Sequence, residues 1–190
     1  YIRHGERHQL PPVIRPQFHH VDIPMLSFLD LQELRFLHAF RARGVSWQAL
    51  RLAHERARQL IGRDHPFATG RFRTDGERIL TEVATESGDP ALEDIVHRQL
   101  VFKRILERYL RGVEFEEDEA ARWFPGPSRR VVLDPGRSFG QPITAREGVP
   151  TRVLAKTYKA EGSYARVARW YQVETASVRA AVEFETRRAA

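Results

Sequence analysis

The sequence contains no cysteine and a single methionine among its 190 residues. The lack of cysteine excludes disulfides, thiolate metal sites and a cysteine nucleophile. No stretch approaches the roughly 20 apolar residues that a membrane-spanning helix requires, and no signal-like segment opens the chain. These absences predict a cytoplasmic protein without membrane contact.

The composition is that of a mildly basic globular protein. Lys and Arg number 31 against 25 Asp and Glu, a formal net charge of +6, and 42% of the residues are hydrophobic. A chain of this length can hold two small domains, each with its own core. The positive charge favours a polyanionic partner, DNA or RNA.

Helix caps and turn residues organise the first part of the chain. Ser27 and Asp30 have the spacing of a capping box, which predicts a helix over 28–43. Ser46 caps a second helix, and Gly62 ends it.

The next segment is predicted to contain a hairpin and then a long helix. The Asp-Gly pair at 75–76 supplies the positive φ angles of a type I′ turn, so we expect a β-hairpin over 72–80. Asp89 and Pro90 begin a helix that runs to Gly112. Arg71 and Arg73 would then lie on a hairpin, where they are candidates for phosphate contact.

The second half combines short strands with a helical end. The segment 113–150 is rich in turns, with a short hairpin around Asp118, and helices follow from Thr151. Proline and glycine at 125–127 mark the expected boundary between a domain over 1–125 and a domain over 126–190. The predicted fold is mainly α with short β hairpins, in two lobes.

A helix-turn-helix is the clearest motif, and it completes a three-helix bundle at the C-terminus. Ser163 and Thr175 cap two short helices joined by a tight connection. The small Ala168 lets these helices cross closely, and Val173 fills the corner between them. A helix over 151–159 supplies the third member.

The outward face of the last helix is poor in base-reading side chains. Projection at 100° per residue places Ala176, Ala180 and Phe184 on it, which favours a protein contact over base reading. Ser177 and Arg179 are the candidates for contact with DNA.

No catalytic arrangement is evident. Adjacent His19 and His20 would point to opposite sides of a strand and have no third ligand near them. No glycine-rich segment ends in Lys-Ser or Lys-Thr, which excludes a P-loop. We therefore expect no catalytic residue, no metal, no cofactor and no enzymatic activity.

Two other functions stay open. A stand-alone regulator that responds to a small ligand could line a pocket with Phe36, Phe40 and Trp47, although core packing explains these aromatics as well. A metal-dependent nuclease could use the carboxylates of the predicted hairpin, although a solvated strand edge explains them better. These carboxylates are Glu114, Glu116, Glu117, Asp118 and Glu119.

Two blocks of sequence resemble a known family. Residues 132–143 (Val-Leu-Asp-Pro-Gly-Arg-Ser-Phe-Gly-Gln-Pro-Ile), then Gly-Val-Pro at 148–150 and the helix-turn-helix, resemble a bacterial family of unknown function that is often encoded beside PIN-domain ribonuclease toxins. Residues 28–46 look like the segment that follows a MerR-like winged helix-turn-helix. In this order, the blocks are similar to VapB-type antitoxins of the larger, two-domain kind.

The resemblance implies a type II antitoxin that neutralises a PIN-domain toxin and represses its own operon, as a homodimer on operator DNA. Residues 1–12 would correspond to the wing and exit of the winged motif, with Arg3 and Arg7 near DNA. The principal DNA-reading helices are then expected upstream of Tyr1. The chain departs from the family at 146–150, where Arg-Glu-Gly-Val-Pro replaces a pattern with Gly-Thr before Ile-Pro.

Overall fold

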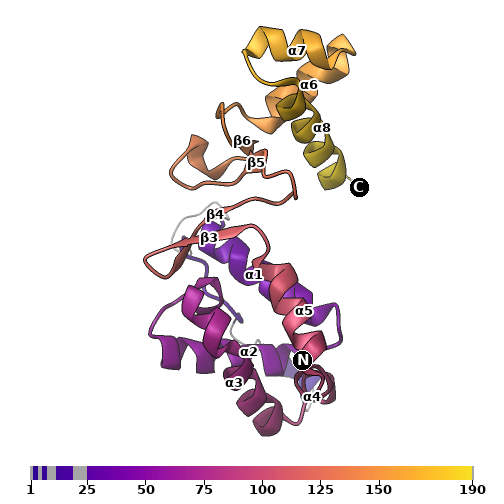
Figure 1. Ribbon diagram of the computed structural model, residues 1–190. Helices are drawn as coiled ribbons and strands as arrows, with labels where there is room; N and C mark the ends of the chain where they lie inside the picture. Colours follow the sequence, from indigo (N-terminus) through magenta and orange to yellow (C-terminus); the bar gives the residue numbers. More distant parts are fainter. Residues whose placement is uncertain (1, 4–5, 8–11, 19–24, 190) are drawn as a thin grey trace. The chain divides into compact units, whose positions relative to one another are not determined.

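The computed structural model describes residues 2–3, 6–7, 12–18 and 25–189, with the backbone alone described at 2–3, 6–7 and 188–189. The chain divides into two compact units, Tyr1–Tyr109 and Leu110–Ala190 (Figure 1). Within the described residues the fold is mainly α with short antiparallel strand pairs, as the sequence predicts.

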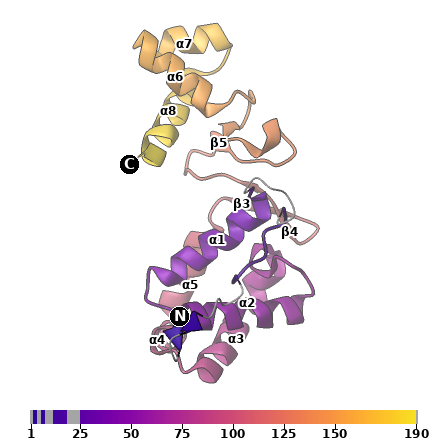
Figure 2. The same cartoon turned by 180° about the vertical axis from the view of Figure 1, so that it is seen from behind.

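The first unit is a helical domain, seen from both sides in Figures 1 and 2. Helix α2 packs against α3, which in turn packs against α4. The elements are β1 (Ile2–Arg3), β2 (Glu6–Arg7), α1 (Phe28–Arg41), α2 (Trp47–Ile61), the 3-10 helix η1 (Pro66–Ala68), α3 (Gly70–Ser87), α4 (Pro90–His97) and α5 (Gln99–Leu110).

The capping residues set the bounds of α1 and α2. The Ser27 side chain accepts from the Asp30 backbone N–H and the Asp30 carboxylate accepts from the Ser27 N–H, which completes the predicted capping box. The Ser46 side chain caps α2. Gly62 ends α2 with a φ of 76°, a left-handed value that glycine adopts without strain. Both predicted helices are confirmed.

The predicted hairpin over 72–80 is wrong, because this segment is the middle of α3. Its buried residues, Phe72, Gly76, Ile79, Leu80, Val83 and Ala84, recur at helical spacing. Gly76 serves packing and not a turn, since a Cβ atom there would lie 3.1 Å from the Phe72 ring.

The predicted long helix is two helices. Asp89 caps the first and Pro90 begins it, as expected. The chain then leaves helical geometry at Arg98, with φ −92° and ψ 74°, and α5 begins at Gln99. The N–H groups of Val101 and Phe102 donate to the Arg98 carbonyl, which starts the new helix.

An aromatic cluster centred on Phe36 holds the first unit together. The Phe36 ring lies 4.0 Å from Phe67, 4.6 Å from Phe40, 5.2 Å from Phe72 and 5.5 Å from Tyr109, measured between ring centroids. These residues come from α1, η1, α3 and α5, so one cluster joins four elements. Such ring pairs stabilise beyond the area that they bury.

Two carboxylates of α1 are buried beside this cluster. The Nε2 atom of His65 lies 2.8 Å from Asp30 Oδ1, and that of His54 lies 2.9 Å from Glu33 Oε2. Glu33 Oε1 accepts the backbone N–H of Phe67 at 2.8 Å. Burial disfavours ionisation of Asp30, but its hydrogen bonds, including those from Ser27 and His65, outweigh burial and lower the pKa of this carboxyl.

The second unit joins a β region to a three-helix bundle (Figure 1). The predicted hairpin around Asp118 is confirmed, with Glu117 and Asp118 in left-handed conformation at its turn. The elements are β3 (Val113–Glu116), β4 (Glu119–Trp123), β5 (Val131–Val132), the 3-10 segment η2 (Ser138–Gly140), β6 (Ile143–Thr144), α6 (Thr151–Glu161), α7 (Tyr164–Tyr171) and α8 (Thr175–Ala189).

Along the chain, the boundary between the two compact units lies between Tyr109 and Leu110. The boundary expected from the sequence is at 125–127. The reason for the difference is the pairing of the β3–β4 hairpin. Trp123 and Leu133 exchange backbone hydrogen bonds of 3.0 and 2.9 Å, which ties the hairpin to the strand that follows the proline-rich turn.

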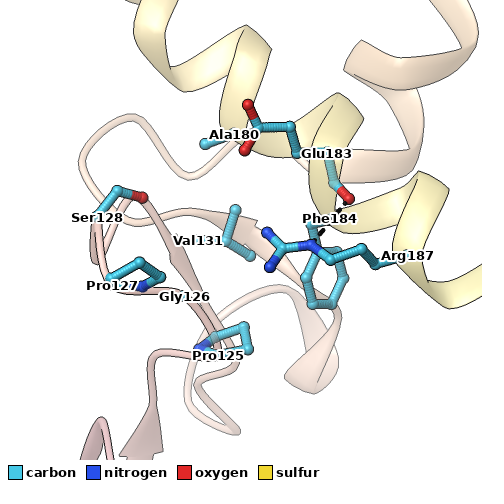
Figure 3. Close-up of a pocket in the computed structure, with 9 residues that line it drawn as sticks. All are labelled: Pro125, Gly126, Pro127, Ser128, Val131, Ala180, Glu183, Phe184 and Arg187. Carbon is cyan, nitrogen blue, oxygen red and sulfur yellow. Dashed lines mark hydrogen bonds between the residues drawn. The ribbon is translucent and has the colours of Figure 1, made fainter.

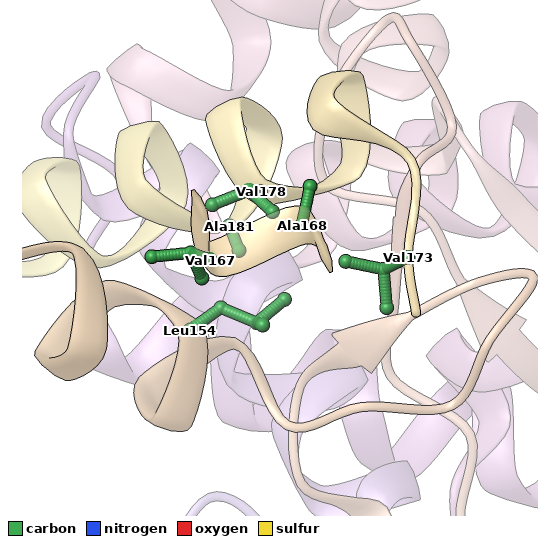
Figure 4. Packing of buried hydrophobic residues seen from close by; sticks show 6 residues of the cluster. All are labelled: Leu154, Val167, Ala168, Val173, Val178 and Ala181. Carbon is green, nitrogen blue, oxygen red and sulfur yellow. The ribbon is translucent and has the colours of Figure 1, made fainter. Parts of the chain in front are cut away.

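The bundle core is small and consists of short side chains. Ala168 and Val173 are buried in it at the positions expected from the sequence. Figure 4 shows Leu154 of α6 pointing toward the residues of α7 and α8. The buried members are Leu154, Val167, Ala168, Val173, Val178 and Ala181.

Asp89 offers a test of how α2 and α4 are joined. Its carboxylate accepts the Leu92 N–H at 2.9 Å, as the cap of α4, and the Ser46 N–H at 3.0 Å, next to α2. We expect Asp89→Ala to lower the free energy of unfolding by about 1–3 kcal/mol in urea denaturation. Asp94→Ala, which removes only the exposed ion pair with Arg98, is the control and should cost less than about 1 kcal/mol. Equal losses in the two variants would contradict the capping role.

Candidate nucleic-acid and partner surfaces

The start of α8 is fixed by a carboxylate from the loop before α6. Glu147 Oε1 accepts the backbone N–H of Glu174 and the hydroxyl of Ser177, both at 3.1 Å. Burial opposes ionisation of Glu147, but these hydrogen bonds, with others from its own loop, outweigh burial and lower its pKa. Glu147 therefore joins the loop before α6 to the first residues of α8.

A second carboxylate, Glu174, extends the anchor through ion pairs. Arg130 Nη1 lies 2.6 Å from Glu174 Oε2, and Arg146 pairs with the other carboxylate oxygen. The hydrogen bond from Arg130 is the main reason that the pKa of Glu174 is lowered. The turn between α7 and α8 is therefore held on the β5–β6 region by charge as well as by the apolar core.

Arg179 is held at the surface by two tyrosines. The Tyr158 and Tyr164 rings stack at 4.0 Å and 12°, and the Arg179 guanidinium lies 4.4 Å from the centre of the Tyr164 ring. A cation over a ring face is attracted to it while its N–H groups stay exposed. Arg179, a predicted DNA contact, is thus exposed, and the Tyr164 ring fixes the position of its guanidinium.

Other exposed side chains lie along α7, the turn and α8. Arg169, Trp170, Gln172 and Thr175 are all exposed, and Trp170 is 57% exposed. Together with Arg179 they form what we call the α7–α8 surface. Arg169, Trp170, Gln172 and Thr175 are not among the predicted contacts, although residues around the turn of a two-helix motif are expected to face a partner.

The other predicted contacts on α8 lie elsewhere. Ser177 is buried and hydrogen-bonded to Glu147, so its hydroxyl does not face solvent. Ala176, Ala180 and Phe184 are half-buried.

Ala180 and Phe184 line a pocket between α8 and the turn after β4 (Figure 3). Its volume is about 200 Å³. The remaining lining residues are Pro125, Gly126, Pro127, Ser128, Val131, Glu183 and Arg187.

In the first unit, the predicted phosphate contacts sit on a helix and not on a hairpin tip. Arg71 and Arg73 are in the first turn of α3, and Arg71 pairs with Asp75 at 3.4 Å. Arg3 and Arg7 lie in the paired strands β1 and β2. The side chains of these two arginines, and His19 and His20, lie outside the described residues.

The aromatic and acidic residues considered for the two alternative functions do not form a ligand pocket or a metal site together. Phe36 and Phe40 are fully buried in the aromatic cluster, while Trp47 is 51% exposed and stacks with Arg41. Around the acidic hairpin, Glu114 and Glu116 pair with Arg122. Within the described residues there is no group of three or more His, Cys, Asp or Glu that could hold a metal ion.

No helix in the described part of the chain is long and apolar enough to cross a membrane.

Comparison with known proteins identifies the family. No family model matches the chain. Over 169 residues the chain is 32% identical to "Putative antitoxin VapB45" of Mycobacterium tuberculosis H37Rv, covering 83% of this chain and 70% of that protein. The chain belongs to the VapB antitoxin family. Among solved structures, the crystal structure of Rv2018 from Mycobacterium tuberculosis matches with a TM-score of 0.68 at 31% identity, covering 83% of this chain and 78% of that one.

The Glu147 anchor generates a prediction for this VapB-family protein. Glu147→Ala leaves the buried Ser177 hydroxyl without its acceptor and should lower the free energy of unfolding by about 1–3 kcal/mol. Ser177→Ala added to Glu147→Ala should cost less than Ser177→Ala alone, because the two side chains share one hydrogen bond. A double-mutant cycle by urea denaturation measures this coupling, and additive losses would refute it.

The coupling should also depend on pH. Because the pKa of Glu147 is lowered on folding, its contribution is complete above the unfolded value of about 4.3 and is lost as the pH falls through the folded value. The difference between wild type and Glu147→Ala should therefore shrink in acid.

Proposed function

We propose that this VapB-family chain is the antitoxin of a type II toxin–antitoxin system, that it neutralises a PIN-domain ribonuclease, and that it represses its own operon by binding operator DNA. The observation that carries the proposal is the 32% identity over 169 residues to VapB45, which spans both compact units and not one motif alone. The antitoxin would act by covering the toxin's Mg²⁺ site or RNA groove, with no chemistry of its own.

The DNA-binding part of the proposal rests on the C-terminal bundle. A short helix, a three-residue turn and a second helix pack on α6, the arrangement of a helix-turn-helix. Its α7–α8 surface carries Arg169 and Arg179, which suit phosphate contact, and Gln172 and Thr175, which can hydrogen-bond to DNA. The buried Ser177 is not part of this surface.

Few groups on α8 can read bases. Near Arg179, the exposed Glu183 is acidic, and the half-buried Ala176 and Ala180 carry no side-chain donor. We therefore expect binding through this bundle to be dominated by phosphate contacts, with weak discrimination among sequences.

Toxin neutralisation is tested with the neighbouring gene product. The chain should co-purify with a PIN-domain protein encoded beside it and should abolish Mg²⁺-dependent RNA cleavage by that protein at a 1:1 ratio of sites. The chain alone, incubated with RNA and Mg²⁺, is the control and also examines the nuclease alternative. RNA cleavage by the chain itself, or an uninhibited toxin, would contradict the proposal.

DNA binding is tested by its salt dependence. If Arg169 and Arg179 each neutralise one phosphate, each alanine variant should reduce the log–log salt slope of duplex affinity by about 0.9. Arg166→Ala is the matched control, because Arg166 lies on the same helix as Arg169 but pairs with Glu161 at 3.0 Å. The same titration of Arg71→Ala and Arg73→Ala examines the first unit. An unchanged slope for Arg169→Ala and Arg179→Ala would remove the α7–α8 surface from the DNA footprint.

A further inference from the structure

Phe139 is displayed on the surface in an unusual way. Its side chain is 99% exposed, more than any other large apolar side chain among the described residues. Its backbone is left-handed, with a φ of 55°, and its neighbours Ser138 and Gly140 have φ values of 47° and 72°. A left-handed conformation is unfavourable for a residue with a bulky side chain, and such residues are concentrated at functional sites.

The loop that carries Phe139 is held by hydrogen bonds. The N–H of Gly140 donates to the Arg137 carbonyl at 3.0 Å, and the N–H of Gln141 to the Ser138 carbonyl at 3.1 Å. The Arg137 guanidinium donates to the Ala145 carbonyl at 3.1 Å, which ties the loop to the segment after β6. The hydrogen bonds therefore fix the backbone that presents the exposed ring, which suits a side chain that anchors a partner.

The same unit offers a place for such a ring. The pocket between α8 and the turn after β4 has apolar walls from Pro125, Val131, Ala180 and Phe184 (Figure 3). Its volume of about 200 Å³ exceeds that of a cavity of about 150 Å³ that takes up benzene. Phe139 does not fill this pocket in its own chain, because its side chain is almost fully exposed.

We propose that two copies of this chain associate by inserting Phe139 of each copy into the Pro125–Phe184 pocket of the other. A two-fold dimer repeats every contact, so one anchor and one pocket per chain give two equivalent contacts. Charges of both signs, Glu183 and Arg187, line the pocket. Arg137, two residues before Phe139, would have Glu183 as its counter-charge, and a cation such as Arg187 is favourable over an aromatic ring. The proposal extends the proposed function, since a two-fold dimer suits a palindromic operator, but its geometry depends on neither toxin nor DNA.

Sedimentation velocity of the full chain over a range of concentrations tests the proposal. Wild type should form a dimer. Phe139→Gly removes the ring and suits the left-handed backbone, and it should weaken the dimer by at least about tenfold. Ala180→Phe fills the pocket from within and should weaken it similarly. Leu100→Ser removes another exposed apolar side chain, 73% exposed and in the first unit, and should leave the dimer unchanged.

A mixing experiment distinguishes mutual insertion from other dimers. Phe139→Gly lacks the anchor and Ala180→Phe lacks the pocket, so neither homodimer has an intact contact. A mixed pair keeps one anchor and one open pocket. Equimolar mixing of differently tagged variants should therefore yield a heterodimer tighter than either variant homodimer. Melting temperatures near that of wild type confirm folding, and Ser128→Phe replaces Ala180→Phe if the latter melts early.

Three results would overturn the proposal. One is a wild-type chain that stays monomeric, and another is a dimer unaffected by Phe139→Gly. The third is a mixture of Phe139→Gly and Ala180→Phe in which the heterodimer is no tighter than either variant homodimer. If Phe139→Gly dimerises normally but loses toxin binding, Phe139 is a toxin anchor instead. Toxin inhibition and DNA affinity are measured on the same variants in separate assays. A failure of the dimer proposal can then be distinguished from a failure of the proposed function. A Phe139-dependent dimer that inhibits no toxin would refute the proposed function alone.

Discussion

The position of α8 depends on two carboxylates that lie at its beginning. Glu147 accepts hydrogen bonds from the Glu174 N–H and from Ser177, and Glu174 pairs with Arg130 and Arg146. Negative charge is favourable at a helix N-terminus, where backbone N–H groups lack partners within the helix. The bundle core consists of a few short side chains, so polar contacts at this corner determine where the exposed residues of α8 point.

The first unit uses the same principle inside its core. Asp30 and Glu33 are both fully buried on α1, and each has a histidine and a backbone N–H as partners. A buried charge is costly unless it is paired, so these partners specify one arrangement of α1, α2 and η1. The neighbouring Arg35 is also desolvated, which lowers its pKa to about 10, and it donates to the Tyr109 carbonyl. The buried polar pairs and the Phe36 cluster thus stabilise the packing of the same helices.

The sequence predicts well those features that local chemistry determines. The Ser27 and Ser46 caps, the hairpin around Asp118 and the crossing at Ala168 all follow from one or a few neighbouring residues. The hairpin assigned to Asp75 and Gly76 fails because tertiary packing overrides turn preference: Gly76 faces the Phe72 ring on the buried side of α3. Likewise, no local signal marks the break at Arg98 or the pairing of Trp123 with Leu133, which moves the division between the units.

The candidate surfaces were harder to predict for a related reason. A helical projection separates the faces of α8, but it does not show what covers each face. Ser177 appears as available as Arg179 in projection, yet Glu147 from a distant loop reaches Ser177 and leaves Arg179 exposed over Tyr164. Phe139 lies in a segment that reads as a simple turn, because side-chain exposure and left-handed geometry are not encoded in residue type.

Under the proposed DNA binding, the packing of α8 limits what the bundle alone would contribute to selectivity. One side of the helix packs on α6 and the bundle core, and another lines the pocket with Ala180 and Phe184. The side chains that stay exposed on α8 are Thr175, Arg179, Glu183, Thr186 and Arg187, two cations and one carboxylate. The two arginines suit contact with a phosphate backbone, but these side chains offer few donors for base edges. If two copies bind an operator as proposed, selectivity would depend on how the two bundles are spaced along the duplex, and the proposed Phe139 contact would set that spacing.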